Sequence, residues 1–129
     1  MSFGFQSYGI TVLRVVVGIV FAVHGYQKLF TFGIHGVSGM FGHLGIPMAG
    51  FFAVVVTVVE FAGGILLILG VGTRIAAALI AIDMIVAILV VHFKNGFFNP
   101  RGIEFPLTLL AAAICLMLAG GGALTLRRS

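Results

Sequence analysis

Residues 47–91 read PMAGFFAVVVTVVEFAGGILLILGVGTRIAAALIAIDMIVAILVV, and this stretch decides the fold class. It contains two long apolar runs, residues 47–69 and 73–91, separated by the tripeptide Gly70-Val71-Gly72. A helix needs about 20 apolar residues to span a bilayer, and these runs are continuous rather than alternating as in a half-buried strand. The stretch therefore predicts two antiparallel transmembrane helices joined by a tight turn.

Two further apolar runs, residues 8–30 and 103–119, flank this hairpin. Residues 31–46 contain five glycines, and residues 94–102 contain an Asn-Gly and an Asn-Pro pair, so both segments are predicted to be loops. In lipid, only helices and closed barrels satisfy the backbone hydrogen bonds. We therefore predict an all-α integral membrane four-helix bundle, with residues 1–129 forming a single domain.

The composition agrees with a membrane location. Hydrophobic residues make up 61% of the chain and charged residues 8%, whereas a soluble domain is about half apolar and about a quarter charged. A chain of 129 residues cannot bury so much apolar surface inside itself, so lipid is the expected solvent. The seven basic residues are scattered and form no basic stripe, which argues against nucleic acid as a partner.

Basic residues near the helix ends predict the orientation. With four spans, both termini and the central turn share one side of the membrane, which we call side A; the opposite side is side B. Side A carries Arg74, Arg127 and Arg128, and side B carries Lys28, Lys94 and Arg101. The counts are equal, but Lys28 belongs to the end of the first helix. Side A, with both termini, is therefore predicted to be cytoplasmic.

Three charged residues lie inside the predicted spans. Arg14 lies about 9 Å in from side A at 1.5 Å per residue, Glu60 about 15 Å and Asp83 about 14 Å. They are therefore expected to form one buried polar layer. A structural interpretation is that Arg14 pairs with the two carboxylates to keep its charge from lipid. A functional one is that two neighbouring carboxyl groups facing one cation hold a proton near neutral pH, as proton transfer requires.

A second polar set is expected at side B, consisting of His24, Lys28, His92 and Glu104. It is predicted to include a Lys28–Glu104 ion pair and to be a contact site for a ligand or partner. A bis-histidine haem or a metal site including His35 and His43 has no supporting motif, so no metal is predicted. Histidines bonded to loop carbonyls or water are the expected state.

Small residues accompany the buried charges. Gly18 and Gly25 share one side of the first helix with Arg14, and Gly63 and Gly64 follow Glu60 on the second. Such glycines favour close helix packing. The alternative is that they leave room for a flat ligand.

Three stretches together resemble the DoxX family of bacterial four-helix membrane proteins. They are LRVVVGIVFAVHGYQKLF at residues 13–30, VEFAGGILLILGVGTRIAA at residues 59–77 and IEFPLTLLAAAICLML at residues 103–118. The resemblance covers nearly the whole chain. It implies a bacterial cytoplasmic (inner) membrane location and a link with quinone-coupled redox chemistry, but no set of cofactor ligands. Its polar positions are Arg14, Lys28, Glu60 and Glu104, whereas Asp83 is less clearly a family position.

The leading hypothesis is therefore an accessory or quinone-interacting subunit of a membrane oxidoreductase system. The alternatives are a small proton-coupled transporter using Glu60 and a purely structural anchor or assembly subunit whose charges are paired. Whether the chain is itself an enzyme stays open. No covalently bound cofactor is implied, although quinone is a candidate ligand. The expected partners are membrane lipid, redox-enzyme subunits and further copies of this chain.

Overall fold

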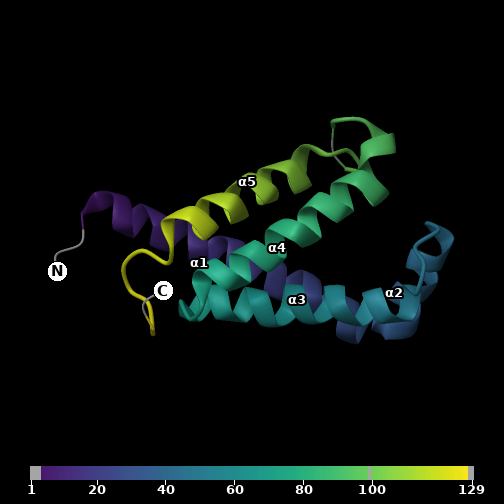
Figure 1. The fold of residues 1–129 in the computed structure, drawn as a ribbon, viewed down its shortest axis with the longest axis horizontal. Coiled ribbons are helices and arrows are strands. Elements are labelled where there is room, and N and C mark those ends of the chain that lie inside the picture. Colours follow the sequence, from purple (N-terminus) through teal and green to yellow (C-terminus); the bar gives the residue numbers. More distant parts are fainter. Residues whose placement is uncertain (1–3, 99, 128–129) are drawn as a thin grey trace.

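The computed structural model describes residues 4–98 and 100–127, so Arg128 of the orientation argument lies outside the described residues. All the secondary-structure elements of the described residues are helices (Figure 1). In chain order these are α1 (Phe5–Tyr26), the π-helix η1 (Gln27–Phe32), α2 (Gly33–His43), α3 (Ala49–Leu69), α4 (Thr73–Ala87), the π-helix η2 (Ile88–His92), the 3-10 helix η3 (Phe93–Asn95) and α5 (Glu104–Ala119).

The four predicted spans correspond to helices, which confirms the all-α membrane class. Three helical stretches are long and apolar enough to cross a bilayer, namely Phe5–His43, Ala49–Leu69 and Thr73–Asn95. The fourth, α5, is apolar but has 16 residues, a length of about 24 Å at 1.5 Å per residue. This is shorter than the roughly 30 Å hydrocarbon core, so by length α5 falls short of a full span.

The helices form two pairs, α1 with α3 and α4 with α5, and the α3–α4 hairpin joins them. Figure 1 shows the pairs close together near the chain termini and diverging toward the end that carries α2. Small and branched apolar side chains fill the space between the pairs, including Val17, Leu67, Ala77, Ile80 and Leu116. This core holds one end of the bundle closed.

Glycines bring α1 and α3 into close contact, as the packing interpretation predicted. A Cβ atom added at Gly18 would lie 2.7 Å from the carbonyl oxygen of Gly64, and one added at Gly64 would overlap the backbone of Ala22. At Gly25, an added Cβ would overlap the backbone of Phe61. The glycines at this contact therefore serve helix packing rather than leaving room for a ligand.

The prediction of a loop over residues 31–46 is wrong, because η1 and α2 occupy most of this segment. Its five glycines lower the intrinsic helix propensity. However, Val37 and Phe41 of α2 are buried against Ala53 of α3, and Ile34 packs beside them. Ile34, Val37 and Phe41 have the three- and four-residue spacing of one helix face, so tertiary packing of this face outweighs the propensity of the glycines.

The segment after α5 crosses the closed end of the bundle. The backbone N–H of Ala123 donates to the carbonyl of Ser7 in α1, and that of Leu126 donates to Leu69 at the end of α3. The N–H of Arg127 donates to Gly70 in the α3–α4 turn. The termini and this turn therefore meet at one end of the molecule, as the four-span topology requires for side A.

Candidate functional site

A cavity of about 760 Å³ lies between the two helix pairs, toward the end where they diverge. Its volume falls within the roughly 300–1,000 Å³ typical of small-molecule sites. Apolar side chains from α1, α2, α3, α4, η2 and α5 form most of its wall. The ionisable side chains that line it are His24, Lys28, Glu60, Asp83 and His92. The cavity thus combines a large apolar surface with a few polar groups.

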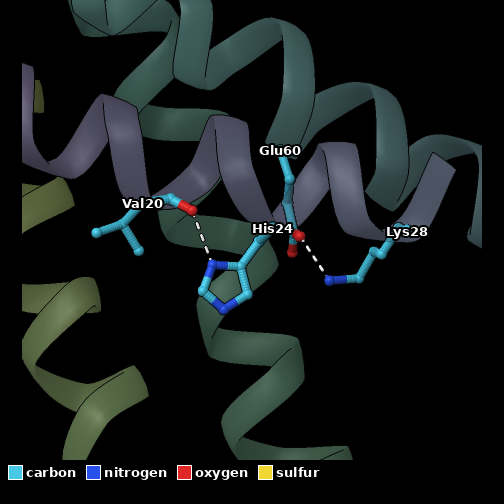
Figure 2. Close-up of polar contacts among 4 residues, drawn as sticks. All are labelled: Val20, His24, Lys28 and Glu60. Atoms are coloured by element: carbon cyan, nitrogen blue, oxygen red, sulfur yellow. Dashed lines mark hydrogen bonds and ion pairs between the residues drawn. The ribbon is translucent and has the colours of Figure 1, made fainter. Parts of the chain in front are cut away.

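The central contact in the cavity wall is an ion pair between Lys28 of η1 and Glu60 of α3. The Lys28 Nζ atom lies 2.7 Å from Glu60 Oε1, and the two side chains are 17% and 6% exposed (Figure 2). The predicted partner of Lys28, Glu104, is therefore wrong. The reason is the close packing of α1 on α3 at Gly25. Lys28 follows Gly25 by about one turn, so this packing places it beside Glu60 rather than at α5.

Asp83 of α4 completes a carboxyl pair with Glu60. Both side chains line the same cavity. The second oxygen of Asp83, Oδ2, is buried without a hydrogen-bond partner among the described residues. The α3–α4 hairpin and η1 therefore place two acidic groups and one cation in the wall of the cavity.

Arg14 belongs to a different site, so the predicted layer of Arg14, Glu60 and Asp83 is wrong. Its guanidinium, in a residue only 1% exposed, donates to the carbonyls of Gly121 (2.6 Å), Leu124 (3.0 Å) and Ala123 (3.2 Å). The hydroxyl of Thr11 also donates to Ala123. Arg14 thus anchors the segment after α5, and backbone carbonyls rather than carboxylates face its charge.

The error in the predicted layer came from the relative positions of the helices. Gly18 lies against Gly64 and Ile68, so Arg14, one turn earlier on α1, lies near the end of α3. Glu60 lies more than two turns deeper in the bundle. Figure 1 shows that α1 begins beyond the end of α3. The predicted depths were counted from the end of each helix separately, so they did not include this offset between α1 and α3.

The two cavity histidines have the same nitrogen bonded to the backbone. His24 Nδ1 lies 2.7 Å from the carbonyl oxygen of Val20 (Figure 2), and His92 Nδ1 lies 3.1 Å from that of Arg101. A carbonyl oxygen only accepts, so in each ring Nδ1 carries the hydrogen. The prediction that the histidines bond to loop carbonyls or water is confirmed for His92, whereas His24 bonds to a carbonyl of its own helix. Both line one cavity, as the parallel course of the first and third spans suggested.

The remaining polar residues of the side B prediction lie apart from this cluster. His35 and His43 are exposed on α2. Glu104 begins α5, where its backbone N–H donates to the carbonyl of Phe97, and it is not among the residues that line the cavity. Within the described residues, no group of three histidine, cysteine or acidic side chains is placed to hold a metal ion.

Sequence reasoning missed the part of the wall contributed by α2 and the segment after it. Met40, Phe41, Ile46 and Pro47 line the cavity opposite α4. Residues 31–46, which include the first three of these, had been predicted as a loop on account of their glycines. The helical spacing of their apolar residues was the available signal. It indicated a helix, although not which surface the helix would cover.

Comparison with known proteins gives one family. The model of the DoxX family matches residues 9–93. A Bacillus subtilis (strain 168) protein that bears the name "Putative oxidoreductase CatD" is 39% identical over 118 residues, covering 92% of this chain and 84% of that protein. An uncharacterized membrane protein of Mycobacterium tuberculosis is 35% identical over 127 residues, covering 90% of this chain and 77% of its own. No solved structure matches this chain.

Proposed function

Because the chain belongs to the DoxX family of membrane proteins, we propose that it is a quinone-interacting subunit of a membrane oxidoreductase system. The observation that carries this proposal is the apolar cavity whose wall holds the Lys28–Glu60–Asp83 group. A relative that bears an oxidoreductase name supports the redox context. The quinone ligand and the redox role are what we propose.

The shape and polarity of the cavity suit a flat ring that carries an apolar tail. The walls from α2 and α5 offer apolar surface for the tail, and the polar groups come from α1 and η1, from α3, and from α4 and η2. Small-molecule sites typically combine such a wall with a few polar groups that orient the ligand. A quinone, when bound, supplies a ring that accepts two electrons and two protons.

The chain's own residues would orient the ring and hold protons. One N–H of Lys28 is directed to Glu60, and an ammonium has two further donors for a ring oxygen. Glu60 and Asp83 place two carboxyl groups in the cavity wall, and the ion pair of Lys28 with Glu60 limits their net negative charge. Such a group is suited to giving or taking a proton as the charge of the ring changes.

We further propose that the protein acts in the cytoplasmic membrane of a bacterium, with both termini in the cytoplasm, and that it contacts a redox-enzyme subunit. Exposed apolar side chains cover all the long helices, so lipid or further membrane subunits must surround them. A second copy of the chain is one such neighbour. The transporter alternative is weakened, because Lys28 neutralises the carboxylate that a cation carrier would need free.

A binding experiment tests the proposal. Protein purified in mild detergent is titrated with a short-tailed quinone, and affinity is measured by calorimetry for the native chain and for Ala87→Trp, which fills the cavity. Ala111→Trp, at an exposed position of α5, is the matched control. We expect binding by the native chain and by the Ala111 variant, and loss of binding in the Ala87 variant. No saturable binding to the native chain would refute the proposal.

The partner is tested separately by purification from membranes of the native host in mild detergent. We expect a subunit with a bound redox cofactor to copurify with the native chain. Recovery of the chain without any redox protein would contradict the assignment as a subunit, while the quinone titration would still decide whether the cavity binds the ligand.

A further inference from the structure

The orientation of His24 defines what its second ring nitrogen can do. Its Nδ1–H donates to the carbonyl of Val20, in the preceding turn of the same helix, at 2.7 Å. The ring also lies beside Phe105 of α5, with 6.5 Å between the ring centroids. These two contacts hold the imidazole in one orientation. In the neutral ring Nε2 is then a hydrogen-bond acceptor.

This acceptor is available to a ligand. His24 lines the cavity, and Nε2 takes part in no hydrogen bond with the described residues. In Figure 2 the second ring nitrogen points away from α1 and from the Val20 carbonyl. Lys28, one turn further along the first helix, presents donors to the same cavity. The two residues are four positions apart on one continuous helical stretch, so their side chains lie on the same side of it. A ligand oxygen that reaches both would meet an acceptor and a donor.

A ring hydroxyl satisfies both groups, whereas a ring carbonyl satisfies only one. A hydroxyl donates through its hydrogen and accepts through its lone pairs, so it bonds to His24 Nε2 and to Lys28 Nζ together. A carbonyl accepts from Lys28 but leaves the His24 lone pair facing an oxygen lone pair. A polar group that the ligand covers and leaves without a partner weakens binding by about tenfold or more.

We propose that the cavity selects the reduced, hydroxylated form of its ring ligand over the carbonyl form, and that His24 is the residue that determines this selectivity. This inference rests on the proposed function, because it presumes that the ligand is a redox-active ring. It specifies which redox form of the ligand the cavity binds more tightly. It also assigns a role to His24 that the Lys28–Glu60–Asp83 group does not fill.

The test compares both forms of one short-tailed ligand. Under anaerobic conditions, a quinol and the corresponding quinone are titrated into the purified chain, into His24→Phe and into His24→Asn. Phenylalanine keeps the aromatic ring but removes the acceptor, and the asparagine side-chain oxygen restores an acceptor. His43→Phe, on the exposed surface of α2, is the matched control. Circular dichroism checks that each variant is folded.

We expect the native chain and His43→Phe to bind the quinol about tenfold or more tightly than the quinone. In His24→Phe the preference should disappear while quinone affinity stays within about threefold, and His24→Asn should regain part of the preference. Equal affinity of the native chain for both forms, or an unchanged preference in His24→Phe, would overturn the inference and leave the proposed function standing. Failure of the native chain to bind either form would refute both.

Discussion

Replacing Lys28 by methionine removes the cation from the ion pair with Glu60 and keeps a side chain of similar length. Glu60 is then left 6% exposed, beside Asp83, with no cation within 4 Å among the described residues. Breaking a buried pair in this way costs about 3–5 kcal/mol. Lys28 is 17% exposed and the pair borders a cavity, so water screens part of the loss. We therefore expect the lower end, about 3 kcal/mol.

The reverse substitution should cost less. In Glu60→Met the orphaned charge is on Lys28, whose long side chain can extend toward the membrane surface at side B. We expect a loss of about 1.5–2 kcal/mol there, the lower part of the range for a hydrogen bond to a charged group. In the double variant neither member of the ion pair is left as an unpaired buried charge. Its stability should lie within about 1 kcal/mol of the native chain, since buried pairs are often replaced by apolar residues without loss.

The assay is a double-mutant cycle on detergent-solubilised protein, with helix content followed by circular dichroism during titration with a denaturing detergent. Lys94→Met, which removes an exposed cation on η3, is the control and should change stability by less than about 0.5 kcal/mol. The reasoning would be refuted if the double variant lost as much as the two single variants combined. That result would mean that the two side chains are not energetically coupled.

Three further substitutions test the packing that surrounds the site. Arg14→Met should lower stability by about 3 kcal/mol or more by removing three hydrogen bonds to the segment after α5, and trypsin should then cleave at Arg127 faster than in the native chain. Gly64→Ala should lower stability by about 1–3 kcal/mol or prevent folding, because the added Cβ overlaps the α1 backbone. Its control is Gly39→Ala, which has open space around it and should be neutral or stabilising in the same detergent titration. Phe41→Ala should lower stability by about 3–5 kcal/mol, because it removes a side chain that is 8% exposed and that holds α2 on α3. It should also weaken ligand binding in calorimetry. Unchanged binding would mean that α2 is not needed to form the cavity wall.

The number, type and approximate ends of the spans followed from the sequence. The most accurate prediction was the hairpin of residues 47–91, which is observed as α3 and α4 joined by the turn at residues 70–72. Gly70 and Gly72 adopt positive φ in this turn. This succeeded because the bilayer imposes a local rule. Each span must satisfy its own backbone hydrogen bonds and present apolar side chains over a known length.

Which polar residues would gather was only partly predictable. The sequence indicated that Glu60 and Asp83 lie at a similar depth, and they do lie together, because adjacent helices of a tight hairpin share one reference point in the turn. Arg14 and Lys28 lie on a helix with no such short connection to α3. Their partners, backbone carbonyls after α5 and Glu60 respectively, were therefore predicted wrongly.

The amino-acid sequence by itself thus determined that this chain is a four-helix membrane protein with acidic and basic groups inside its spans, because hydropathy and turn residues act locally. The tertiary structure alone decided the offset of α1 along α3, through glycine contacts between segments far apart in the chain. That offset places Lys28 on Glu60 and Arg14 on the terminal segment. It also leaves His24 facing a cavity whose far wall includes α2, a helix formed against its own glycine content by packing on α3.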